Sequence, residues 1–220
     1  MPHALRGIIT DWGGVLTGPL GPTIDAWLAA DRIDRDHYGA VMREWFAGLR
    51  ETDGGGNPIH ALERGEIPVP EFESRLAAEL RLVDGGRVPA EGLISRMFSA
   101  FHPVEEMYEV LRLARDQGVR TALLSNSWGN GYPRERFAEV FDAVVISGEV
   151  GMRKPEREIF HLAAERGGLR PQECVFIDDL EHNVAAAIEL GMTGILHTDA
   201  ATTRTLLAEA FGADLQPAGA

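Results

Sequence analysis

Six residues of this sequence have side chains that could act together on one small molecule. Each stands beside a short apolar run or, for the lysine, just before a proline. They are Asp11, Ser125, Asn126, Lys154, Asp178 and Asp179. Carboxylates that converge repel one another and require a cation. Because oxygen ligands without a cluster of Cys or His favour Mg²⁺ over zinc, we expect Mg²⁺ as the cofactor.

A site with this composition is suited to phosphoryl transfer. A divalent cation and the ammonium of Lys154 would neutralise the phosphoryl oxygens, while the hydroxyl and amide of Ser125 and Asn126 add polar contacts. One of the carboxylates could then attack the phosphorus in line. The residue types therefore indicate a phosphate ester as the substrate class.

The apolar runs before these residues predict the elements that position them. We expect buried strands at 7–10, 119–124, 143–146, 174–177 and 193–196. Segments with helical spacing alternate with the later runs, for example Met107, Val110, Leu111 and Ala114. This alternation predicts an α/β fold with a doubly wound parallel sheet. In such a sheet the C-terminal ends of the strands share one edge, where ligands bind.

Residues 19–100 show no convincing strand pattern. Val41, Met42 and Trp45 recur at helical spacing, and Pro70 begins a further helical segment. We therefore predict an all-helical insertion over 19–100, with residues 1–18 and 101–220 forming the α/β core. The loop 53–57 is expected to contribute to specificity, and 212–220 to form a loose tail.

Composition excludes several classes of protein. The 220 residues are 45% apolar and carry a formal charge of −13, which argues against nucleic acid and against an anionic membrane as partners. No apolar run approaches the roughly 20 residues that a membrane-spanning helix requires. Cys174 is the single cysteine, so no internal disulfide can form, as suits a cytoplasmic protein. We expect a monomer or a homodimer with a small phosphorylated metabolite as its substrate.

Four segments, taken in order, resemble the motifs of the haloacid dehalogenase-like hydrolase superfamily. They are Ile8-Ile9-Thr10-Asp11 with Gly14-Val15-Leu16-Thr17 after it, Leu123-Leu124-Ser125-Asn126, Gly151-Met152-Arg153-Lys154-Pro155, and Phe176-Ile177-Asp178-Asp179 with Asn183. Each motif alone is weak, but all four in order are a strong signal. The helical insertion, with Gly65-Glu66-Ile67-Pro68 inside it, resembles the helical cap of subfamily I. The resemblance covers nearly the whole chain.

This resemblance implies roles for the individual residues. Asp11 would be the nucleophile, Lys154 would pair with the nucleophile and the phosphate, and Ser125 and Asn126 would bind the phosphate. The Mg²⁺ ligands would be Asp11, the backbone carbonyl of Gly13 and Asp179, with Asp178 acting through water or orienting the others. Trp12 is expected to line the substrate pocket, and Arg153 to be a surface residue. Together these roles imply a phosphatase of a small phosphomonoester that acts through an aspartyl-phosphate.

The sequence departs from the family pattern at one position. The first motif usually reads Asp-x-Asp, and here it reads Asp11-Trp12-Gly13. The second Asp normally serves as general acid and base, which contributes roughly 10²–10⁴-fold to the rate. We therefore expect a slow enzyme unless another group substitutes. The candidates for a replacement acid are His102, His182 and His197.

Two other functions are compatible with the same motifs. The loss of the acid at position 13 would suit a module that binds a phosphate ligand with little catalysis. A metal-independent 2-haloacid dehalogenase would also use an Asp nucleophile. The fourth motif of the dehalogenases is less acidic, so Asp178-Asp179 favours the phosphatase.

Overall fold

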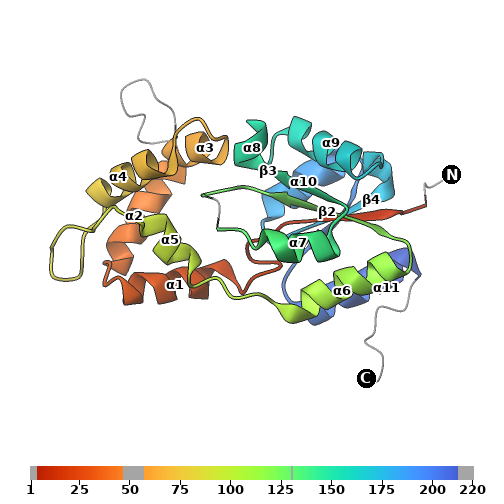
Figure 1. The fold of residues 1–220 in the computed structure, drawn as a ribbon, viewed down its shortest axis with the longest axis horizontal. Coiled ribbons are helices and arrows are strands. Elements are labelled where there is room, and N and C mark those ends of the chain that lie inside the picture. The colour runs from red at the N-terminus through yellow and green to blue at the C-terminus, as the bar shows by residue number, and fades with distance from the viewer. Residues whose placement is uncertain (1–3, 47–56, 130, 213–220) are drawn as a thin grey trace.

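A five-stranded parallel sheet forms the centre of the larger part of the molecule. The computed structural model describes residues 4–46, 57–129 and 131–212. The strands run in the order β3-β2-β1-β4-β5 (Figure 1). Their bounds are β1 Gly7–Thr10, β2 Arg120–Ser125, β3 Ala143–Ile146, β4 Cys174–Asp178 and β5 Thr193–Leu196. The predicted α/β class and parallel sheet are confirmed, and β1 is the central strand.

Helices cover both faces of this sheet (Figure 1). One face carries α6 Glu105–Asp116, α7 Arg134–Val140 and α11 Ala200–Phe211. The other carries α9 Arg157–Arg166 and α10 Glu181–Glu189. Alternation along β1 explains the two layers: Ile8 packs with the first group of helices and Ile9 with the second. Every strand position of β1 is buried, as expected for a parallel sheet covered on both sides.

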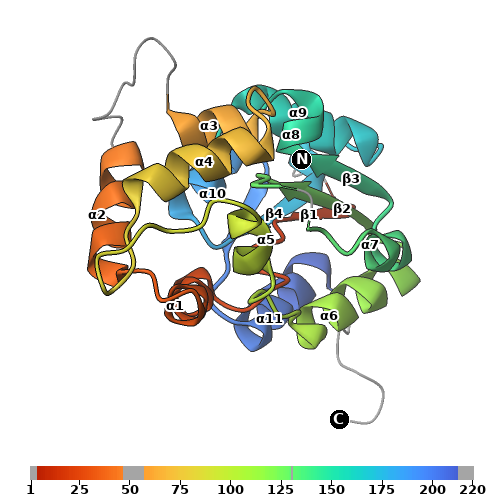
Figure 2. The same cartoon turned by 60° about the vertical axis from the view of Figure 1, so that its left-hand side comes forward.

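The helices between Leu20 and Phe98, here called the cap helices, form a separate layer beside the sheet (Figures 1 and 2). They are α1 Leu20–Ala30, α2 Arg35–Phe46, α3 Pro58–Glu63, α4 Val69–Glu79 and α5 Leu93–Phe98. Their hydrophobic residues form a cluster of their own that includes the fully buried Trp27, Phe72 and Leu76. This separate cluster supports our prediction of a helical insertion over 19–100, and the domain boundaries remain a prediction.

The two chain segments that join the cap helices to the sheet lie side by side. Thr17 and Pro103 form an antiparallel bridge. The N–H of Gly18 donates to the carbonyl of His102 at 3.0 Å, and the N–H of Val104 donates to the carbonyl of Leu16 at 2.9 Å. The entry and the exit of the insertion are therefore paired by backbone hydrogen bonds.

The structure changes some details of the predicted elements. The segment Leu20-Gly21-Pro22 looks like a bend but forms the first turn of α1. A proline is tolerated there because the N–H groups of a helix's first turn have no partner within the helix. A four-residue helix, α8 Ser147–Val150, follows β3. The predicted loop 53–57 and tail 212–220 fall, apart from Asn57 and Gly212, outside the described residues. Among the described helices, none is long and apolar enough to span a bilayer.

Candidate active site

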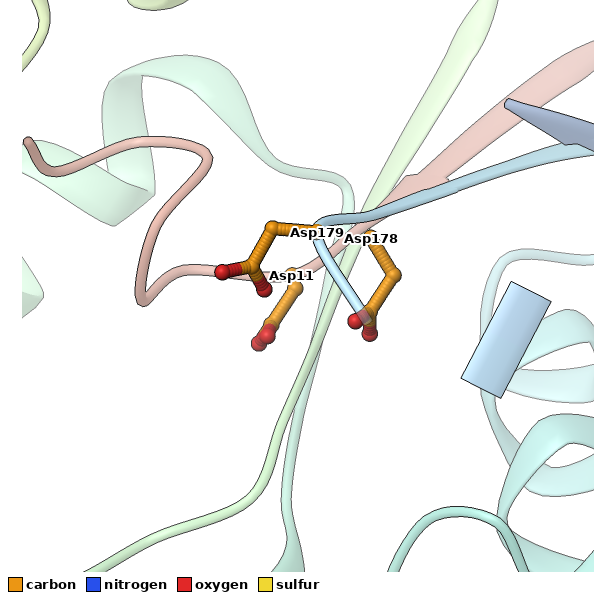
Figure 3. Close-up of side chains that lie close together, drawn as sticks. All are labelled: Asp11, Asp178 and Asp179. Atoms are coloured by element: carbon orange, nitrogen blue, oxygen red, sulfur yellow. The ribbon is translucent and has the colours of Figure 1, made fainter. Parts of the chain in front are cut away.

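Three carboxyl groups meet beyond the C-terminal ends of the two adjacent strands β1 and β4 (Figure 3). Asp11 follows β1, Asp178 is the last residue of β4, and Asp179 comes directly after it. One oxygen from each of the three lies within 4.8 Å of the others. The strand register alone produces this convergence, because Thr10 pairs with Ile177. The predicted meeting of these side chains at one sheet edge is therefore present in the structure.

Lys154 is the counter-ion of this cluster. It is the only lysine in the sequence, and its side chain is 1% exposed. The ammonium lies 3.0 Å from Asp11 Oδ1 and 2.6 Å from Asp178 Oδ2. Burial alone would lower the pKa of Lys154, but the two carboxylates outweigh it, so the pKa rises. Lys154 therefore stays charged and holds the two acids together.

Asp178 is fully engaged by the protein. The amide of Asn183 donates to both of its oxygens at 3.1 Å, and the N–H of Leu180 donates to Oδ1 at 2.9 Å. With the ammonium of Lys154 on Oδ2, this fully buried carboxylate has partners on each oxygen. These contacts suit a residue that orients Lys154. The expected role of Asp178 at the metal, through water or by orienting the other ligands, remains a prediction.

Asp179 is in the opposite situation. Its Oδ1 is buried and has no hydrogen-bond partner among the residues that the structure describes. A buried oxygen of this kind costs free energy unless a cation or a proton satisfies it. Burial, then the charge of Asp178, raises the pKa of Asp179 to about 6. Burial also raises the pKa of Asp11, to about 7, although the charge of Lys154 opposes this shift.

Gly13 and Gly14, the two glycines that follow Trp12, differ in whether the structure has room for a side chain. Gly14 has φ +75°, and a Cβ there would stand 2.3 Å from Asp179 Oδ2, so its side chain must be absent. Gly13 has an ordinary φ, and the heavy atom nearest to a Cβ there would be Leu20 Cδ2 at 3.5 Å. Position 13 therefore has room for a side chain, and Gly13 is not required by the backbone.

Ser125 at the end of β2 and Asn126 directly after it have different hydrogen-bond partners. Ser125 is buried, and its hydroxyl lies 2.9 Å from the hydroxyl of Tyr132. Asn126 uses its side chain on the backbone of Lys154: Oδ1 accepts from the Lys154 N–H at 2.8 Å, and Nδ2 donates to the Lys154 carbonyl at 3.1 Å. Asn126 therefore fixes the segment that carries Lys154, a role that the sequence did not suggest.

Trp12 lies in an aromatic cluster where the sheet meets the cap helices. Its ring is stacked on Phe101 with centroids 5.7 Å apart, and Tyr132 meets it edge-on at 4.9 Å. Phe98 at 5.9 Å completes the cluster. The side chain is buried and contributes to packing, and its contact with a substrate remains a prediction.

The three histidines differ in their surroundings. His102 and His182 are exposed. His197 is half-buried and follows β5, with Nδ1 2.8 Å from Thr203 Oγ1. It lines a cavity of about 520 Å³ that Asp179 also borders. Burial lowers the pKa of His197.

Arg153 is not the surface residue that we expected. Its side chain is 13% exposed and pairs with Glu63 of α3. The indole N–H of Trp128 donates to the same carboxylate at 3.0 Å. Neither Glu63 nor Tyr132 was a candidate in the sequence. The contacts of Glu63 depend on how distant segments dock, and Tyr132 lies seven positions after Ser125 in a segment with no recognisable motif.

Comparison with known proteins assigns the family. A family model of haloacid dehalogenase-like hydrolases matches residues 5–191, which is most of the chain. The chain belongs to this hydrolase family. The resemblance stated from the four motifs is thereby confirmed, as is the expectation of an enzyme.

Two curated proteins are similar to this hydrolase over most of its length. A Mycobacterium tuberculosis phosphatase is 28% identical over 213 residues, covering 91% of each chain. Acyl-CoA dehydrogenase family member 10 of Mus musculus is 29% identical over 86% of this chain, which spans 18% of that protein. The chain spans 18% to 40% of the length of the first four curated relatives that it matches.

A solved structure has the same architecture. A HAD family enzyme of Bacteroides thetaiotaomicron, in complex with magnesium and inorganic phosphate, superposes with a TM-score of 0.63 at 25% identity. The match covers 89% of this hydrolase and 95% of that chain. The fold of the hydrolase therefore matches that of a HAD family enzyme over most of the chain.

Proposed function

We propose that this hydrolase is a Mg²⁺-dependent phosphatase that acts on a small phosphomonoester through an aspartyl-phosphate on Asp11. The main support is the position of Asp11. It is a buried carboxylate at the end of the central strand, paired with Lys154 and next to Asp179, whose Oδ1 has no hydrogen-bond partner among the described residues. A phosphoryl group brings negative oxygens to this place, so cations must accompany it. The M. tuberculosis relative named a phosphatase supports the same reaction class.

The donor set fits magnesium. Three carboxylates and a single buried ammonium leave the cluster with an excess of negative charge. The orphaned Oδ1 of Asp179 is a hard oxygen ligand of the kind that Mg²⁺ prefers. Asp11, Asp179 and the carbonyl of Gly13 would hold the ion, and Asp178 would keep Lys154 in place. When bound, the ion would neutralise the phosphoryl oxygens.

The residues of the chain define two chemical steps. In the first, a carboxylate oxygen of Asp11 attacks the phosphorus, the new O–P bond forms, and the bond to the ester oxygen breaks. In the second, water attacks the same phosphorus, and the Asp11 carboxylate leaves with inorganic phosphate as the product. Lys154 stays protonated through both steps and stabilises the charge on the phosphoryl oxygens. Ser125, oriented by Tyr132, and the loop held by Asn126 would bind the phosphoryl group.

The glycine at position 13 limits the first step. The departing oxygen needs a proton when the leaving group is an alkoxide, and position 13 has no side chain to supply it. An aryl oxygen leaves as a stable anion and needs no such help. We therefore propose a slow phosphatase whose deficit is largest for alkyl esters.

The experiment is a phosphate-release screen over aryl phosphates, sugar phosphates, nucleotides and lipid phosphates, with and without Mg²⁺. We expect multiple turnovers with Mg²⁺ and their loss in EDTA. Phosphate binding without turnover would identify a binding module instead. Halide release from a 2-haloacid in EDTA would identify a metal-independent dehalogenase.

A further inference from the structure

One carboxylate of the cap helices is buried between two loops of the sheet domain. Glu63, the last residue of α3, has a side chain that is 7% exposed. Its Oε2 accepts from Nε of Arg153 at 2.5 Å, and its Oε1 accepts from the indole N–H of Trp128 at 3.0 Å. Arg153 immediately precedes Lys154, and Trp128 stands just after Ser125 and Asn126 in the chain. Glu63 thus joins the two loops that contribute the non-acidic side chains of the site.

The next residue in the chain holds the same segment from its other side. Arg64 pairs with Glu156, with Nε 2.9 Å from Oε1. The second oxygen of Glu156 accepts the backbone N–H of Arg153 at 3.0 Å. Glu63 therefore binds the side chain of Arg153 directly. Arg64 acts on the backbone of Arg153 indirectly, through Glu156.

These contacts close a ring around the phosphate-binding loops. Within the sheet domain, the side chain of Asn126 already joins the two loops through the backbone of Lys154. Glu63 joins them a second time, from the cap, through Trp128 and Arg153. A segment fixed at two points keeps its direction better than one fixed at a single point. The direction of this segment decides where the Lys154 ammonium lies relative to Asp11.

The backbone brings the cap close enough for this arrangement. A Cβ at Gly65, which has φ +71°, would stand 2.5 Å from the carbonyl oxygen of Gly148 in α8. The chain after α3 therefore lies directly against α8. Glu63, Arg64 and Gly65 form one continuous docking segment.

We propose that Glu63 is a positioning residue that couples docking of the cap helices to the geometry of the phosphate-binding loops. This inference rests on the proposed function for its relevance to catalysis. Its physical content is separate: with the Glu63 carboxylate in place, Lys154 is held against Asp11 and shielded from solvent. Without that carboxylate, the half-buried Arg153 guanidinium loses its charge partner, and we expect the loop 151–156 to loosen.

The chain offers a direct readout, because Lys154 is its only lysine. Glu63→Gln keeps the size of the side chain and removes its charge. We expect an amine-reactive reagent to modify Lys154 about 10-fold faster in Glu63→Gln than in the wild type, as measured by peptide mass spectrometry. We also expect the inhibition constant of inorganic phosphate to rise about 10-fold, the lower end of what loss of an orienting partner costs.

The matched control is Glu71→Gln. Glu71 is also a cap carboxylate paired with an arginine, but its partner Arg75 lies in the same helix, α4. In this variant, Lys154 should be modified at the wild-type rate, and the inhibition constant of inorganic phosphate should be unchanged. A double variant with Arg153→Gln should be no worse than Glu63→Gln alone, because both changes break one interaction.

The outcomes separate the two proposals. If the wild type turns over phosphate esters while Glu63→Gln labels and binds phosphate normally, the positioning role is wrong and the proposed function stands. If the wild type binds phosphate without turnover, the function is wrong and the labelling still decides the role of Glu63. A lower Tm with unchanged labelling and binding would show a merely structural role and overturn the proposal. Should Glu63→Gln not fold, Trp128→Phe removes one donor to the same carboxylate and is expected to raise labelling as well.

Discussion

The backbone of Gly14 lies against the carboxylate of Asp179, so close that a Cβ at position 14 would stand 2.3 Å from Oδ2. A side chain at position 14 would force Gly14 or the Asp179 carboxylate to move. The turn after β1, which contains Gly14, therefore packs directly against Asp179, the acid after β4. Two segments far apart in the sequence thus build one side of the proposed metal site.

Gly14→Ala tests this contact. The new methyl group collides with Asp179 and also occupies a left-handed backbone conformation, which costs about 1–3 kcal/mol. We expect a lower Tm and at least a 10-fold weaker affinity for Mg²⁺, measured by calorimetry. Gly21→Ala is the matched control, because that position has an ordinary φ and no heavy atom within 4 Å of a Cβ there. Equal effects from the two substitutions would contradict the assignment.

Gly13→Asp tests whether a missing acid limits the rate. The space around position 13 admits a side chain, so the variant should fold. We expect the rate on alkyl phosphates to rise by about 10²-fold, the lower end of the range for general acid–base catalysis. The gain on aryl phosphates should be smaller, since their leaving groups need no proton. Gly13→Asn has the same shape without the acid and should give no such gain.

Asp11→Asn tests the nucleophile. The amide cannot form the acyl-phosphate, so turnover of an aryl phosphate should fall by at least about 10⁴-fold, as is typical when a covalent nucleophile is removed. The fold should persist, because one of three converging acids becomes neutral. Asp116→Asn, an exposed position at the end of α6, serves as the control. Undiminished turnover in Asp11→Asn would exclude the proposed mechanism.

Lys154→Met tests the buried counter-ion. The substitution leaves Asp11 and Asp178 buried without their common cation, and breaking such a pair typically costs about 3–5 kcal/mol. The loss in free energy of unfolding should be smaller at pH 6 than at pH 8, because Asp11 can then bind a proton. Denaturant unfolding of the wild type and the variant at pH 6 and at pH 8 measures this loss in free energy. A loss that is the same at both would show that Asp11 does not titrate in this range.

The raised pKa values of Asp11 and Asp179 predict how pH and metal interact. Both groups are near their ordinary pKa of 3.8 in the unfolded chain and at about 7 and about 6 in the folded, metal-free protein. Their contribution to stability is thus present below pH 3.8 and is lost as the pH rises through 6 and 7. Mg²⁺ competes with these protons. The increase in Tm on adding Mg²⁺ should therefore be larger at pH 8 than at pH 6, and an equal increase would contradict the ligand assignment.

The acidic part of the site could be predicted from the sequence. Asp11 and Asp178 each end an apolar run, and parallel strands deliver their C-terminal residues to a common edge. The strands 143–146 and 193–196 agree with the structure because their apolar runs are short and bounded. These inferences use only local patterns and one rule of topology.

The supporting contacts could not be predicted in this way. The bonds from Asn126 to Lys154 join residues 28 positions apart, and those from Glu63 to Arg153 join residues 90 apart. No periodicity marks such a contact, since it exists only once two loops and a helix have docked. Arg153 looked like a solvated charge because its partner belongs to another layer of the fold.

The backbone pairing of Thr17 with Pro103 affects how much entropy the core loses when it closes around the segment between them. Because the insertion leaves and re-enters the core at neighbouring points, the core closes around it as it would around a short loop, whatever its size. Lengthening an insertion whose ends already meet adds little entropic cost. An inserted segment of another length could therefore join the core at the same two points with little change in the entropy of closing it.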